Sequence, residues 1–70
     1  MNEPIIFYLN DTIKQLIESA KNLTDRNDFD KGVRIEFYQT ISLLLNQSVA
    51  FGVYEKLNKE IKEFNIESLI

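Results

Sequence analysis

Residues 37–54 read FYQTISLLLNQSVAFGVY and form the longest run without a charged side chain in this sequence. The apolar residues recur every three or four positions, which is the period of an α-helix rather than the alternation of a strand. Continued back to Phe29, the pattern predicts one helix over residues 29–51. Gly52 then follows as a left-handed C-terminal cap, with Val53 as its apolar partner. Because a helix facing water usually carries charges, we expect this one to be covered on most of its circumference.

A second amphipathic pattern lies N-terminal to this helix. Apolar residues spaced by three and four positions predict a helix over residues 4–23, and Pro4 suits its first turn. The alternative is a short strand over residues 5–9, followed by a helix capped at Asn10, or at Thr12 with Gln15 as its capping-box partner. We favour the single helix because the helical period continues unbroken through this segment.

The rest of the chain supplies a loop, a third helix and a tail. Residues 24–28 are all polar and predict the loop between the two long helices, with Asn27 or Asp28 as the cap of the second. Apolar positions at helical spacing and opposite charges four residues apart predict a third helix over residues 54–64. The last residues include Ile66, Leu69 and Ile70, and such an apolar terminus is expected to dock on the protein.

Composition limits the possible chemistry. The 70 residues, taken as one domain over 1–70, include no cysteine and no histidine. Disulfides and thiolate or imidazole metal sites are therefore excluded, and the usual catalytic bases and nucleophiles are missing. We expect no enzymatic activity and no cofactor or metal. A domain this small buries only about 60–65% of its unfolded surface, so self-association or tight packing must stabilise it.

Charge and hydropathy argue against nucleic acid and membrane as partners. The net charge is −3, and the basic residues within 26–34 and 56–62 are interleaved with acidic ones, which is unlike a nucleic-acid-binding stripe. No segment approaches the roughly 20 apolar residues of a membrane span, and no secretion signal is evident, so we expect a cytoplasmic protein. The abundance of Ile, Asn and Lys is typical of an AT-rich bacterial or phage genome.

The expected fold is all-α: an antiparallel helical hairpin plus a short third helix. Two arrangements could cover the uncharged helix. In one, two copies pair through it as a dimeric helical bundle. In the other, the first and third helices cover it within a monomer. We favour the dimer because a third helix of about three turns cannot cover a helix of about six.

Two sides of the uncharged helix have different expected neighbours. We assign one side to the chain's own core: Val33, Phe37, Ile41, Leu44 and Phe51. The expected intermolecular interface combines the other side with the tail: Tyr38, Leu45, Val49, Ile66 and Leu69.

The functional expectation is a non-enzymatic protein-interaction module of the regulator, adaptor or inhibitor type, acting through helix faces. Its partners would be a second copy of itself and another protein. The alternative is a module that binds a small apolar ligand between helices near Phe37, Phe51 and Tyr38.

Overall fold

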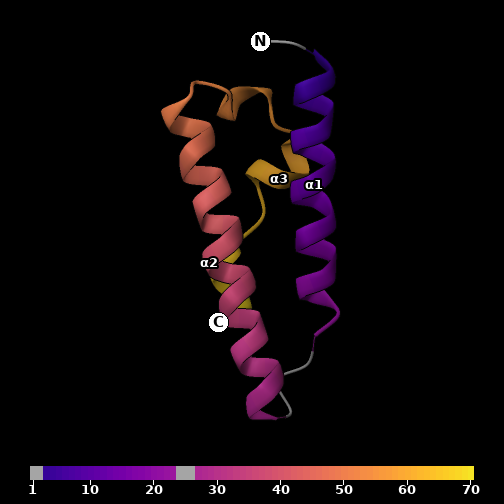
Figure 1. Ribbon diagram of the computed structural model, residues 1–70, viewed down its shortest axis with the longest axis vertical. Coiled ribbons are helices and arrows are strands. Elements are labelled where there is room, and N and C mark those ends of the chain that lie inside the picture. The colour runs from indigo at the N-terminus through magenta and orange to yellow at the C-terminus, as the bar shows by residue number, and fades with distance from the viewer. Residues whose placement is uncertain (1–2, 24–26) are drawn as a thin grey trace.

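The computed structural model describes residues 3–23 and 27–70, and every regular element in these ranges is helical. Two long antiparallel helices lie side by side in an elongated molecule of 41 × 19 × 17 Å (Figure 1). The predicted all-helical fold, a hairpin with a short third helix, is confirmed. In chain order the elements are α1 (Glu3–Lys21), α2 (Asp28–Ala50), the 3₁₀ helix η1 (Tyr54–Lys56), α3 (Lys59–Lys62) and the 3₁₀ helix η2 (Ile66–Leu69).

The boundaries of the hairpin follow the predicted signals. Residues 5–9 belong to α1, so the alternative of a strand there is wrong. At the start of α2 the Asn27 side chain accepts a hydrogen bond from the Asp30 backbone N–H at 2.8 Å, as expected of a helix cap. Of the predicted loop over 24–28, residues 24–26 lie outside the described part of the chain.

The C-terminal end of α2 is a Schellman turn. Gly52 has a φ of 73°, which glycine adopts without the steric cost that a side chain brings. The Val53 N–H donates to the Ser48 carbonyl at 2.8 Å, and the Gly52 N–H donates to the Val49 carbonyl at 3.0 Å. Val53 is buried behind the turn, as the sequence predicts. This turn sends the chain back across the hairpin.

The predicted third helix over residues 54–64 is wrong as one continuous element. Between η1 and α3 the backbone is extended at Leu57 and Asn58, with ψ angles of 151° and 148°. The cause is α1: the buried Asn10 side chain accepts from the Asn58 N–H at 2.6 Å and donates to the Lys56 carbonyl at 3.3 Å. In a continuous helix the Lys56 carbonyl and the Asn58 N–H would bond to other backbone groups of that helix. Here both bond to Asn10 instead, and Leu57 between them lies in the core.

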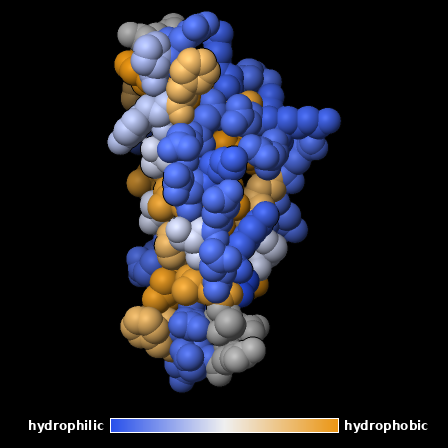
Figure 2. Space-filling model, turned by 90° about the vertical axis from the view of Figure 1, so that its right-hand side faces the viewer, coloured by the Kyte–Doolittle hydropathy of each residue, from blue (hydrophilic) through white to orange (hydrophobic). Residues whose placement is uncertain are grey.

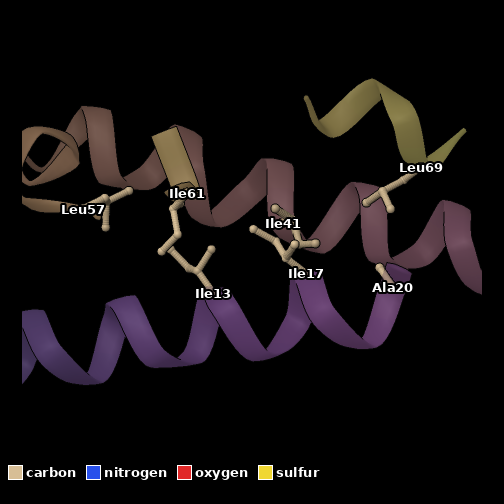
Figure 3. Close-up of a cluster of buried hydrophobic side chains, with 7 residues drawn as sticks. All are labelled: Ile13, Ile17, Ala20, Ile41, Leu57, Ile61 and Leu69. Atoms are coloured by element: carbon tan, nitrogen blue, oxygen red, sulfur yellow. The ribbon is translucent and has the colours of Figure 1, made fainter. Parts of the chain in front are cut away.

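The core is a strip between α1 and α2, closed by the C-terminal segments (Figure 3). α2 contributes the fully buried Ile41, and η2 contributes Leu69, which is 2% exposed. The expectation that the tail docks on the protein is therefore confirmed. The buried cluster consists of Ile13, Ile17, Ala20, Ile41, Leu57, Ile61 and Leu69.

Of the side of α2 assigned to the core, Ile41, Phe37 and Leu44 follow the prediction, whereas Val33 is half-buried outside the core cluster. Ile41 is buried, and Phe37 and Leu44 pack half-buried against it. Phe51, however, is 75% exposed, so its assignment to the core is wrong. Phe51 is the C-cap residue of α2, at the start of the Gly52 turn. It is Val53, on the other side of this turn, that is buried at this end of the hairpin.

Candidate interaction surface

One side of α2 is left uncovered by the chain itself. Successive residues of a helix are about 100° apart, and the side chains on this side of α2 lie on the flank away from α1 and beside η2. Ile35 and Val49 are 45% and 62% exposed, and both are apolar. Tyr38, Ser42 and Leu45 lie between them and are half-buried. We call this set the open face; its members are Ile35, Tyr38, Ser42, Leu45 and Val49.

The open face has an uncharged polar outer edge and an apolar inner edge. Gln39 and Asn46 are exposed along the outer edge. On the inner edge, Ile66 joins Tyr38 and Leu45 in the lining of a shallow hollow of about 560 Å³. The tail therefore borders the open face without covering it.

The tail is fixed beside the open face by Arg34. Its guanidinium donates from Nε to the Leu69 carbonyl at 3.0 Å and from Nη2 to the Ser68 carbonyl at 2.9 Å. A longer bond of 3.4 Å joins Nη1 to the Leu23 carbonyl after α1. The planar fork of arginine suits such convergent carbonyls, which a lysine could not bridge in the same way. Arg34 thus ties together both long helices and the C-terminal segment.

The outer side of α1 has a different character. Figure 2 views the molecule from the side on which α1 lies, and that surface is mainly hydrophilic. Asp11, Lys14, Glu18 and Lys21 are exposed along it. The outer side of α1 therefore carries charged residues, whereas the open face of α2 carries none. The open face is therefore a surface poorly suited to solvent.

The structure distributes the five predicted interface residues over two environments. Tyr38 and Leu45 are half-buried and pack against the core cluster while also lining the open hollow. Val49 is exposed, and Ile66 is half-buried at the inner edge. Leu69 differs, because it is part of the chain's own core and no surface for a partner. Its assignment to the interface is wrong because the chain buries this side chain in its own core, while the Leu69 carbonyl accepts a hydrogen bond from Arg34.

Two positioning residues were not singled out by sequence reasoning. Asn10 was considered only as an alternative helix cap, yet it lies inside α1, is 6% exposed and bonds to residues 46 and 48 positions away. The signal was present: Asn10 falls four residues after Ile6 and three before Ile13, on the buried face of the helix. A polar residue at such a position needs a partner, which the sequence could not name. Arg34 belongs in sequence to the basic residues within 26–34 that are interleaved with acidic ones, and this pattern does not reveal its bonds to the tail.

None of the hollows lined by Phe37 or Tyr38 gathers the three aromatics proposed to hold a small ligand. Phe37 lines a groove with Leu16 on the α1 side of α2, whereas Tyr38 lines the hollow on the opposite flank. Phe51 protrudes at the end of α2. Among the hollows described, none is an enclosed apolar cavity of the kind that holds a small molecule.

The described residues provide neither a cluster of acidic metal ligands nor a helix that could span a membrane. Within 3–23 and 27–70, no three acidic side chains are grouped so that they could hold a metal ion. None of the helices described in these ranges combines the length and apolarity needed to cross a bilayer.

The chain matches no known family model, and neither a curated protein nor a solved structure shows detectable similarity to it.

Proposed function

We propose that this chain is a non-enzymatic protein-interaction module that binds another protein chain through the open face of α2. One observation carries the proposal: two exposed apolar side chains, Ile35 and Val49, lie on one side of α2, and this helix carries no charge from Phe37 to its end at Ala50. A helix side that is both apolar and uncharged is costly to solvate and is typical of a contact between helices.

The energetics favour a contact of moderate strength. Each apolar Å² removed from water contributes about 25 cal/mol, but association also costs translational and side-chain entropy. The open face combines two exposed aliphatic residues with half-buried neighbours and hydrogen-bonding edges. Gln39 and Asn46 could form hydrogen bonds across a contact without the desolvation cost of a charge. This composition resembles the apolar centre and polar rim of transient interfaces.

The module that binds a small apolar ligand is the weaker candidate. It requires a cavity between helices, and the aromatics that would line it point to different flanks of α2. A protein partner needs only a continuous strip, which the open face provides.

The proposal is tested by introducing a charge at Val49. This residue is exposed and contributes little to the core, and a lysine in the last turn of a helix interacts favourably with the helix dipole. Val49→Lys should therefore leave the fold intact while burying an unpaired cation in any contact, at a cost of several kcal/mol. The matched control is Gln15→Lys, on the exposed side of α1.

Tagged chains of the three sequences would be expressed in the native cell together with an untagged copy, and the polypeptides they retain compared. The expected result is a stoichiometric protein chain that wild type and Gln15→Lys retain and Val49→Lys loses. Equal retention by all three sequences, or recovery of a bound small molecule in place of a protein, would contradict the proposal.

A further inference from the structure

We infer that the occupant of the open face is a second copy of this chain, with the two α2 helices packed antiparallel about a two-fold axis level with residue 40. The inference rests on the proposed function and names its partner. It follows from the spacing of the side chains, their sizes and the distribution of charge along α2.

The first observation is a coiled-coil spacing along the open face. Its residues, extended by one turn towards the N-terminus, are separated alternately by four and three positions, which is the a/d spacing of a heptad. One flank of this seam, at Ile41 and Ser48, is buried by the chain itself. The other flank is open, so a single further helix can pack along the seam. Its six positions are Lys31, Ile35, Tyr38, Ser42, Leu45 and Val49.

The second observation is that the seam is complementary to itself in the antiparallel direction. With the axis level with residue 40, Tyr38 of one copy lies opposite Ser42 of the other, so that a large side chain meets a small one. Ile35 lies opposite Leu45 in the next layer, and both are aliphatic. Such alternation of large and small residues lets facing layers interdigitate. This register also overlaps the two helices over residues 30–50, whereas a shift by one heptad towards the C-terminus would leave Ile35 beside Gly52.

The third observation concerns charge. The last turn of α2 contains no basic residue to interact with its exposed carbonyl groups. In the antiparallel register Lys31 lies opposite Val49 of the second copy and brings an ammonium group to that turn. Lys31 is exposed at the border of the tail, where it can reach across. The two-fold axis supplies the same contact at both ends.

Parallel pairing lacks these features. It would place each Lys31 against its equivalent, so that like charges face each other. It would also set Tyr38 against Tyr38 in one layer and Ser42 against Ser42 in the next, which alternates crowding with a gap. The acidic first turns, which contain Asp28 and Asp30, would lie together as well. Because each copy carries a net charge of −3, contact is easiest through a seam that has no acidic side chain and whose only charged residue is Lys31.

The chain has no cysteine, so engineered thiols report on the register without background. Three outer-edge positions are suitable: Gln39, Asn46 and Gly32, where an added Cβ meets no atom within 4 Å. In the proposed register, Gln39 of one copy lies beside Gln39 of the other, and Gly32 lies beside Asn46. Gly32 is displaced from its own equivalent by about 24 Å along the axis, at about 1.5 Å per residue.

Each variant would be treated with a short bifunctional thiol reagent, after circular dichroism has shown that its helix content is unchanged. Gln39→Cys alone should form covalent dimers several-fold above the collisional level of Gln15→Cys on α1. Gly32→Cys and Asn46→Cys should remain at that level separately and link several-fold above it when mixed.

Efficient linking of Gly32→Cys and Asn46→Cys each to itself would establish parallel pairing and overturn the register. If all variants stay at the level of Gln15→Cys, the second copy is overturned as the occupant. Loss of a different retained protein in Val49→Lys would then leave the proposed function standing, so the two failures are distinguishable.

Discussion

Asn10 is the best single site at which to test the account of the fold. Its amide joins α1 to the segment between η1 and α3 by bonds to the Lys56 carbonyl and the Asn58 N–H. Asn10→Ala removes both and leaves these backbone groups without their partner. A net hydrogen bond contributes about 1 kcal/mol, and an unsatisfied buried group costs about 1–3 kcal/mol. Alanine recovers about 0.5 kcal/mol through its higher helix propensity.

The expected net loss is about 2 kcal/mol, a large part of the few kcal/mol that stabilise a domain this small. It corresponds to a fall in melting temperature of about 10 °C. Urea unfolding followed by circular dichroism at one fixed protein concentration measures the loss, with Gln15→Ala on the exposed side of α1 as control. Asn10→Asp retains the acceptor for Asn58 but turns a carboxylate towards the Lys56 carbonyl. It should therefore be less stable at neutral than at acidic pH, where the protonated carboxyl can donate. A loss no greater than that of Gln15→Ala would refute the role given to Asn10.

Two further predictions use matched pairs. Gly52→Ala should destabilise the protein by about 1 kcal/mol, because the φ of 73° at this position strains any side chain. Gly32→Ala, within α2 and with free space around it, should stabilise the protein by about 0.5–1 kcal/mol. Equal effects of the two changes in thermal unfolding would argue against the turn described. Leu69→Ala should cost about 2–3 kcal/mol because this side chain is buried in the core, while the neighbouring Ile70→Ala, at a residue 67% exposed, should change stability by less than about 0.5 kcal/mol. Similar losses for both in urea unfolding would show that the tail is not docked as described.

The two long helices and the turn at Gly52 are predictable because they depend on local rules. The hairpin follows from helical spacing in α1 and α2, and the turn at Gly52 follows from the absence of a Cβ. Both are properties of short segments, and both are confirmed. The docking of the tail was predictable from its apolar residues, although its anchor was not.

The third helix could not be predicted from local rules, because a contact from far along the chain interrupts it. Spacing and charge pairs in residues 54–64 favour a continuous helix, and one of the expected pairs, Lys59 with Glu63, is present at 3.9 Å on the surface. Such an exposed pair contributes little. The bonds from Asn10 outweigh it, and they join residues almost fifty positions apart, which no periodicity can reveal.

The candidate site was predictable in part, because the absence of charge along α2 is visible in the sequence. The absence of charge in residues 37–54 identified α2 as the helix with an unusual surface, and Tyr38, Leu45 and Val49 do share one flank. The division between core and surface was less predictable. At the Gly52 turn Val53 is buried and Phe51 is exposed, and the position of Leu69 depends on the tail whose carbonyls Arg34 holds. Neither contact is visible in the helical spacing.

The mass of the chain in solution tests the central proposal, that another chain covers the open face of α2. Light scattering across a series of protein concentrations would measure it for wild type and for Val49→Lys. With a monomer mass of 8.2 kDa, wild type should rise towards twice that value as concentration increases, and Val49→Lys should remain at 8.2 kDa. A wild-type mass that stays at 8.2 kDa throughout, with no other protein bound, would contradict the account.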